Sequence, residues 1–200
     1  NLVMNGVRKI IQSFSLGIDA TFGDMIVKKE KENLLRKFNL YENIYFTILT
    51  IVFTSTFVLI NYFIKVYTRN ITDINYLRYT FGSIFTISEY IWAIRLPYSN
   101  LVQSAGHFNE TKKGAWVESI LNIFISIILV NKYKLVGVAI GTLVAMITRT
   151  VEFIWHANKY ILCRNILINI KRIVIDNVNL DTYIIDEIKK YENIYLKEEV

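Results

Sequence analysis

The sequence predicts an all-α fold, a polytopic bundle of about five transmembrane helices. Apolar residues make up 53% of the 200-residue chain. Charged residues cluster between the apolar runs, whereas in a soluble amphipathic bundle they would alternate along the helix faces. Residues 43–64 contain no Asp, Glu, Lys or Arg, and at about 1.5 Å rise per residue a helix of this length crosses a bilayer. These observations predict an integral membrane protein.

The five expected spans follow one another with short connections. The first is the apolar opening of the chain, and the second contains the uncharged run. The third contains Pro97, which cannot donate a hydrogen bond to the carbonyl of Ala93, so we expect a bend there. The fourth is rich in Ile, and the fifth carries a stripe of small residues, Gly137, Gly141 and Ala145, that allows close helix packing. The expected spans are residues 2–22, 41–66, 79–102, 115–131 and 135–157.

The chain divides into a transmembrane bundle, residues 1–162, and a cytoplasmic tail, residues 163–200. The tail begins with apolar residues at helical spacing, which favours a position along the membrane surface. It ends in an acidic stretch that can form a short amphipathic helix. A loosely packed, solvated tail is the alternative.

Basic residues in the connections predict the orientation of the bundle. One side of the membrane receives about twice as many as the other, and we assign it to the cytoplasm. The larger group contains Lys28, Lys29, Lys31, Arg36, Lys37, Lys112, Lys113, Lys159, Arg164, Lys171 and Arg172. The smaller group contains Lys65, Arg69, Arg78, Lys132 and Lys134.

Charged residues inside the spans are functional candidates, because each costs about 2.5–3.5 kcal/mol to insert. Arg8, Arg95 and Arg149 are candidates for a cavity that binds an anionic substrate such as a phosphate or pyrophosphate, since arginine contacts phosphate oxygens in a bidentate way. The alternative for Lys9, Arg95 and Glu118 is a position near the membrane interface, which we favour for Glu118. Arg149 and Glu152 are three residues apart and are expected to pair with each other.

Other chemistry has weak support in the sequence. The single cysteine, Cys163, excludes an internal disulfide. His107 and His156 have no partner at the spacing of metal ligands, so we expect no metal site. The sequence carries no P-loop, nucleophile elbow or paired catalytic carboxylates, so we expect neither a cofactor nor an enzyme. The basic residues fit membrane orientation better than nucleic-acid binding.

Four segments carry a resemblance to a known family. They are residues 14–29, with a small-residue turn before a charged segment, and residues 95–108, with Arg95-Leu96-Pro97-Tyr98 and Ala105-Gly106-His107-Phe108. The other two are Lys112-Lys113 followed by Glu118 and Asn122, and Gly137-Val138-Ala139-Ile140-Gly141-Thr142. In this order and spacing they resemble the C-terminal part of bacterial O-antigen-type flippases, the lipid-linked oligosaccharide transporters of the multidrug/oligosaccharidyl-lipid/polysaccharide superfamily.

The resemblance implies the second bundle of a MATE-like transporter with two bundles around a central cavity. Such a protein would flip polyprenyl-pyrophosphate-linked oligosaccharide across the bacterial inner membrane by alternating access. The cationic cavity of the family is consistent with Arg8, Arg95 and Arg149 as phosphate contacts. If an ion gradient drives transport, Glu89, Glu152 and Asp19 are the coupling candidates. The implied partners are the lipid bilayer, the lipid-linked oligosaccharide and a missing N-terminal bundle of the same protein.

Alternative functions remain open at this stage. A cation-coupled multidrug exporter of the same superfamily would need a cavity lined by carboxylates. A membrane-embedded glycan polymerase or glycosyltransferase would need a large outer loop or a pair of catalytic carboxylates. A structural or subunit membrane protein is the last alternative. The chain opens inside an apolar segment without Met, so we expect a fragment of a longer transporter instead.

Overall fold

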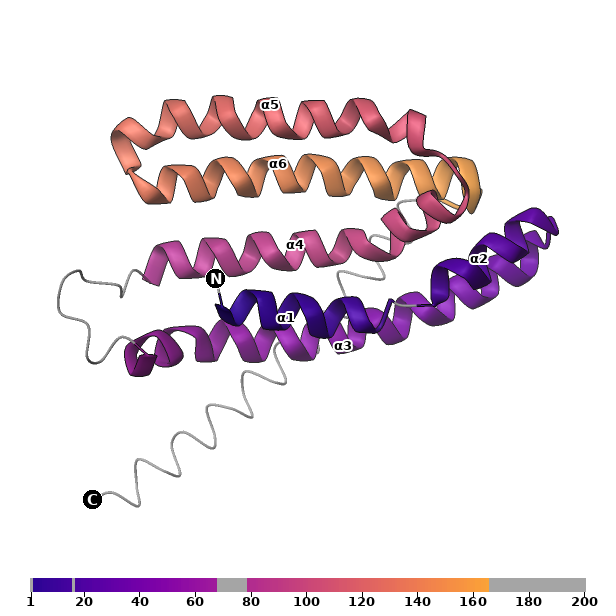
Figure 1. Cartoon of the computed structure of the whole chain (residues 1–200), viewed down its shortest axis with the longest axis horizontal. Coiled ribbons are helices and arrows are strands. Elements are labelled where there is room, and N and C mark those ends of the chain that lie inside the picture. Colours follow the sequence, from indigo (N-terminus) through magenta and orange to yellow (C-terminus); the bar gives the residue numbers. More distant parts are fainter. Residues whose placement is uncertain (1, 16, 68–78, 166–200) are drawn as a thin grey trace, which may run out of the picture.

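The computed structural model describes residues 2–15, 17–67 and 79–165, and all regular elements in these residues are helices (Figure 1). The expected connection between the second and third spans, residues 68–78, and the tail beyond Asn165 lie outside the described residues. The helices are α1 Leu2–Ser13, α2 Ile18–Val27, α3 Lys31–Tyr67, α4 Tyr79–Ser104, α5 Phe108–Tyr133 and α6 Leu135–His156, followed by the π-helical turn η1 Ala157–Ile161. The expected all-α class is therefore confirmed for this part of the chain.

Helix α6 lies between α4 and α5, and α3 packs on the other side of α4 (Figure 1). Helix α1 contacts α4, while α2 packs against both α3 and α4 near one end of the bundle. The turns from α2 to α3 and from α4 to α5 lie at the same end as η1, and the turn from α5 to α6 lies at the opposite end (Figure 1). The described members of the basic group assigned to the cytoplasm, from Lys28 to Arg164, thus gather at one end, which we call the basic end.

Among the described residues, three helices are long and apolar enough to cross a membrane: Lys31–Ile60, Phe108–Tyr133 and Leu135–Ile161. The pair formed by α1 and α2 makes a fourth candidate if it is counted as one broken span. The expected α4 span exists as a helix but is not in this set. Polar side chains such as Thr86, Ser88 and Glu89 lower its hydropathy, and all three are buried in the bundle. The expected number of five spans is therefore not confirmed.

The first expected span, residues 2–22, is wrong as a continuous helix. α1 ends at Ser13, α2 begins at Ile18, and their axes differ by 40°. Gly17, which precedes α2, has a φ of 83°, a left-handed conformation that glycine adopts without steric cost. Gly17 was the one feature of the sequence that indicated a break. The segments on both sides of it are apolar, so hydropathy alone predicted a single span.

The other helices extend beyond the expected spans. α3 begins at Lys31, ten residues before the predicted start, because Leu34 and Phe38 recur one turn apart and are both buried. α5 likewise begins at Phe108 and continues the predicted span at its basic end. α6 matches the prediction, since it begins at Leu135 and ends at His156.

The core gathers large side chains where α2, α3 and α4 meet. Phe38, Tyr45, Leu49, Tyr98 and Leu101 are among its fully buried members. Aromatic rings pack edge-on or tilted within it, with centroid separations of 5.8 Å for Phe38 and Tyr98 and 5.6 Å for Tyr41 and Tyr45. Such pairs add to the stability that burial itself provides.

Pro97 lies inside α4, as predicted, and is fully buried. The last turns of α4 leave the line of the rest of the helix (Figure 1). Pro97 has no N–H, so it cannot donate a hydrogen bond to the carbonyl of Ala93. This carbonyl instead accepts a hydrogen bond of 2.8 Å from the buried hydroxyl of Tyr45 in α3. This bond joins α3 to α4 at the point where α4 is interrupted.

The expected close packing of the small-residue stripe is confirmed. Gly137, Gly141 and Ala145 are buried on the face of α6 toward α5. A Cβ atom at Gly137 would lie 2.5 Å from the backbone oxygen of Leu129, and one at Gly141 would lie 2.3 Å from Oγ of Ser126. The absence of side chains at these glycines therefore sets the distance between the two helices.

Candidate functional site

Four charged residues from α4, α5 and α6 form a connected set, which we call the charge network: Arg95, Glu118, Arg149 and Glu152. Arg95 contacts Glu118 with an Nη1–Oε1 distance of 3.1 Å. The other carboxylate oxygen of Glu118 lies 3.6 Å from Nε of Arg149, and Nη1 of Arg149 lies 2.6 Å from Oε2 of Glu152. Positive and negative groups thus alternate, and one carboxylate bridges two arginines.

Arg149 is the most enclosed member of the charge network, with 8% of its side chain exposed. Its Nη1 also donates a hydrogen bond of 2.7 Å to the backbone oxygen of Thr111. Its guanidinium carbon lies 4.4 Å from the ring centroid of Phe153, close enough for a cation–π interaction. The carboxylates of Glu118 and Glu152 are 27% and 29% exposed, so the network is open on the carboxylate side.

Three members of the charge network, Glu118, Arg149 and Glu152, lie within two of the candidate spans, and Arg95 contributes from α4. Glu118 is ten residues from the start of α5. The expectation that Glu118 lies near the membrane interface stays a prediction. A carboxylate within a span needs a cationic partner, and Glu118 has two.

Gly114 makes room for the charge network on α5. A Cβ atom at this position would lie 1.6 Å from Oε2 of Glu152 and 2.1 Å from Nη1 of Arg149. The ion pair of α6 therefore rests against the backbone of α5. Gly114 was not among the residues predicted for the site.

Arg8 and Glu89 form a second ion pair, between α1 and α4. Nε and Nη2 of Arg8 donate to the two carboxylate oxygens of Glu89 at 2.5 and 2.6 Å, a bidentate arrangement. Glu89 is 1% exposed and the Arg8 side chain 37% exposed. The guanidinium carbon of Arg8 also lies 4.9 Å from the ring centroid of Trp92. Arg8 is thus partly accessible, whereas its partner is enclosed.

The structure brings together only part of the predicted site. Arg95 and Arg149 share Glu118, and the predicted pairing of Arg149 with Glu152 is confirmed. Arg8 belongs to the separate pair with Glu89. Asp19 is exposed in the first turn of α2 and forms no ion pair within the described residues. All three candidate arginines therefore have carboxylate partners in this conformation.

A third polar cluster was not predicted from the sequence. Arg164, just after η1, contacts both carboxylate oxygens of Glu42 at 2.9 and 3.0 Å, and its guanidinium also donates to Asn39 and Asn158. The hydroxyl of Tyr98 donates to Glu42 as well. Glu42 is 3% exposed. The cluster fastens the end of the last helix to α3, and we find no sequence spacing that could have revealed it.

The two histidines lie closer together than the sequence suggested. Nδ1 of His107 and Nε2 of His156 are 3.0 Å apart, and the His156 ring centroid is 4.9 Å from that of Tyr160. One imidazole donates to the other, which joins the turn between α4 and α5 to the end of α6. Within the described residues no group of three or more His, Cys, Asp or Glu side chains could hold a metal ion.

No protein-family model, curated protein or solved structure matches this chain. The description of its function therefore rests on the charged groups within an apolar helical bundle.

Proposed function

We propose that this protein is a membrane transporter that flips polyprenyl-pyrophosphate-linked oligosaccharide across the bacterial inner membrane by alternating access. The observation that carries the proposal is the charge network, which joins three helices and lies within two candidate spans. Ionisable groups within membrane spans are costly, and they characteristically mark substrate and ion pathways.

Arginine suits the pyrophosphate group of such a substrate. The guanidinium offers a planar pair of donors to phosphate oxygens and stays charged when it is enclosed. Arg95 and Arg149 contact the same carboxylate of Glu118, so they also present two guanidinium groups to one place. In the proposed mechanism the substrate phosphate replaces Glu118 between the two arginines, and the carboxylate and the substrate compete for them.

This competition also provides a way to couple transport to a cation. A proton or metal cation that neutralises Glu118 or Glu152 would free the arginines for the anionic substrate. Glu89 would act in the same way on Arg8 in the second ion pair. The broken segment from α1 to α2 supports movement at that pair, since discontinuous helices are common in transporters that operate by alternating access.

The proposed transporter contains a second bundle, the N-terminal bundle implied by the family resemblance. The outer face of α5 is consistent with contact to that bundle or to lipid. None of the apolar stretch of this helix is buried against the other described residues. The exposed side chains of this face include Trp116, Ile120, Ile123, Phe124 and Ile127.

A cation-coupled multidrug exporter is the second candidate, and one observation favours it. Each of the three candidate arginines lies beside a glutamate, so the enclosed charge is closer to neutral than the excess of arginines in the sequence suggested. A cationic drug could then bind the carboxylates that face the open side of the charge network.

Replacing Arg95 or Arg149 by Gln in the intact gene tests the first candidate. We expect loss of surface polysaccharide with normal amounts of protein in the membrane, because each change removes a phosphate contact. Lys113→Gln is the matched control, because Lys113 is an exposed cation on α5, five residues before Glu118 and outside the charge network. Wild-type export from both arginine variants would reject the proposed site, and unchanged export together with increased sensitivity to cationic dyes would favour the drug exporter.

A further inference from the structure

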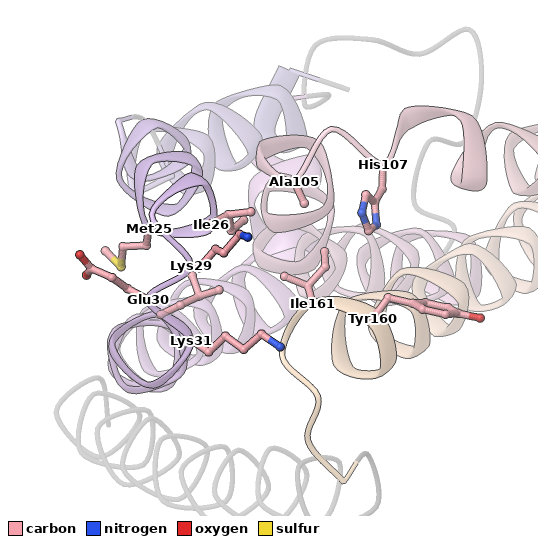
Figure 2. Close-up of a pocket in the computed structure, with 10 residues that line it drawn as sticks. Met25, Ile26, Lys29, Glu30, Lys31, Ala105, His107, Tyr160 and Ile161 are labelled. Carbon is pink, nitrogen blue, oxygen red and sulfur yellow. The ribbon is translucent and has the colours of Figure 1, made fainter.

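A cavity of about 200 Å³ lies at the basic end of the bundle, away from the charge network (Figure 2). It is formed where the turn between α2 and α3, the turn between α4 and α5, and η1 come together. Its lining residues are Met25, Ile26, Lys29, Glu30, Lys31, Leu34, Ala105, His107, Tyr160 and Ile161.

The charged side chains around this cavity are arranged by sign. Lys29 and Lys31 direct their ammonium groups toward it, whereas the carboxylate of Glu30 points away (Figure 2). That carboxylate accepts a hydrogen bond of 2.8 Å from the side-chain amide of Asn33. In the part of the chain that the structure describes, neither Lys29 nor Lys31 has an ion-pair partner. The cavity therefore presents two ammonium groups without a carboxylate between them.

The neighbouring lysine differs from these two. Lys28 forms an ion pair of 2.7 Å with Asp24, and this hydrogen-bonded partner raises the pKa of the Lys28 ammonium group. The ammonium group of Lys28 is thus paired with a carboxylate of the preceding helix, α2. The turn separates one lysine with an acidic partner from two that face the cavity.

The backbone of the turn ends α2 and brings Lys29 and Lys31 to the same place. Lys29 has a φ of 57°, the left-handed conformation of the residue that follows a helix. The N–H of Lys29 donates to the carbonyl of Ile26 and the N–H of Glu30 to that of Met25, the two bonds of a Schellman motif. Lys31 is the first residue of α3, whose N-terminus adds partial positive charge to the same place.

Besides Glu30, His107 and Tyr160, the rest of the cavity lining is apolar. Met25, Ile26, Leu34, Ala105 and Ile161 provide carbon surface directly beside the ammonium groups. A ligand that matches both the ammonium groups and the carbon surface of the cavity has an anionic phosphate joined to a hydrocarbon portion. The end of a membrane-spanning bundle lies at the level of the lipid headgroups, and basic pockets between helices on this side of a membrane bind anionic lipid headgroups.

We propose that this cavity binds the phosphate of an anionic phospholipid in the leaflet at the basic end. Lys29 and Lys31 contact the phosphate, and the glycerol and first acyl carbons lie against Ile26 and Ile161. A bound lipid here contacts all three connections of the bundle at once. The inference depends on the membrane location of the protein and not on what it transports.

Native mass spectrometry of the delipidated protein tests this site. The protein is titrated in separate arms with phosphatidylglycerol, phosphatidylcholine and inorganic phosphate. The double variant Lys29→Gln/Lys31→Gln is compared with Lys112→Gln/Lys113→Gln, which removes the same charge from exposed positions of α5 outside the cavity. Circular dichroism verifies that both variants keep their helix content.

We expect phosphatidylglycerol to bind about 30-fold more weakly to the cavity variant and nearly as before to the control, since two lysine contacts are lost only in the first. Phosphatidylcholine should bind the wild-type protein more weakly than phosphatidylglycerol. Equal weakening in both variants, or no weakening in the cavity variant, would overturn the proposal. Inorganic phosphate that binds as tightly as phosphatidylglycerol would keep the phosphate contacts but reject the lipid as their source.

Discussion

The interruption of α4 at Pro97 shows how one residue sets a contact between helices. Proline removes the donor for the carbonyl of Ala93, and in an apolar bundle an unsatisfied carbonyl costs about 1–3 kcal/mol. The hydroxyl of Tyr45 replaces that donor from α3. The sequence predicts the loss of the bond, but the replacement donor is 48 residues away in the chain, and no local pattern identifies it.

Tyr45→Phe should therefore lower the free energy of unfolding by about 1–2 kcal/mol, because the Ala93 carbonyl loses its replacement donor. In a Pro97→Ala background the same change should cost less, since residue 97 then supplies an N–H to that carbonyl. Reversible unfolding of the four proteins in mixed micelles, analysed as a double-mutant cycle, measures the difference. Equal costs in both backgrounds would mean that the hydroxyl does not replace the missing helix bond.

The ion pairs show which part of the candidate site is predictable from the sequence. Arg149 and Glu152 lie three residues apart on one helix, so their pairing follows from helix geometry. The pairing of Arg95 with Glu118 and of Arg8 with Glu89 depends on how separate helices rotate against each other. Spacing along the chain carries no information on that rotation, so the two arginine partners of Glu118 cannot be identified from the sequence.

At the scale of helices, contact between α5 and α6 is decided by small residues. The repeat of Gly137, Gly141 and Ala145 is visible in the sequence, and close packing of the helix is predicted from it. The break between α1 and α2 and the early start of α3 were not predicted. Hydropathy reports the apolar content of a segment and not the conformation of one residue such as Gly17.

Gly137→Ala should destabilise the protein by about 1–3 kcal/mol, the usual cost of overpacking, because its Cβ would press on the backbone of α5 at Leu129. Gly6→Ala is the matched control, because a Cβ there meets nothing within 4 Å and alanine favours the helix by about 0.5–1 kcal/mol. Thermal unfolding in detergent should thus shift down for the first and slightly up for the second. A shift of the same sign and size in both would contradict the close packing of α5 on α6.

At the scale of the whole molecule, the sequence predicts a helical membrane bundle. The described residues form helices throughout, and three or four segments are long and apolar enough to cross a membrane. The basic residues gather at one end because alternate connections return to that end (Figure 1). The number of spans is less well predicted, since α4 combines an apolar surface with polar groups that it buries in the bundle, and α1 and α2 together provide one broken candidate. Which end faces the cytoplasm is still a prediction from charge.

Cys163, which is exposed near the basic end, reports that orientation directly. A membrane-impermeant maleimide should label it in inverted vesicles and leave it unlabelled in intact spheroplasts, because basic connections stay in the cytoplasm. In a Cys163→Ser background, Lys132→Cys at the other end of α5 should show the reverse pattern. Labelling of Cys163 from outside would reverse the assigned topology.

The central claim is that a carboxylate and a pyrophosphate compete for the arginines of the charge network. Binding of polyprenyl pyrophosphate to the purified protein in nanodiscs tests it most directly. Glu118→Gln should tighten binding by about tenfold, which corresponds to about 1.4 kcal/mol, because the competing charge is removed. Arg149→Gln should weaken it by at least as much. Weaker binding in both variants, or no change in either, would contradict the claim and leave the network a structural element of the bundle.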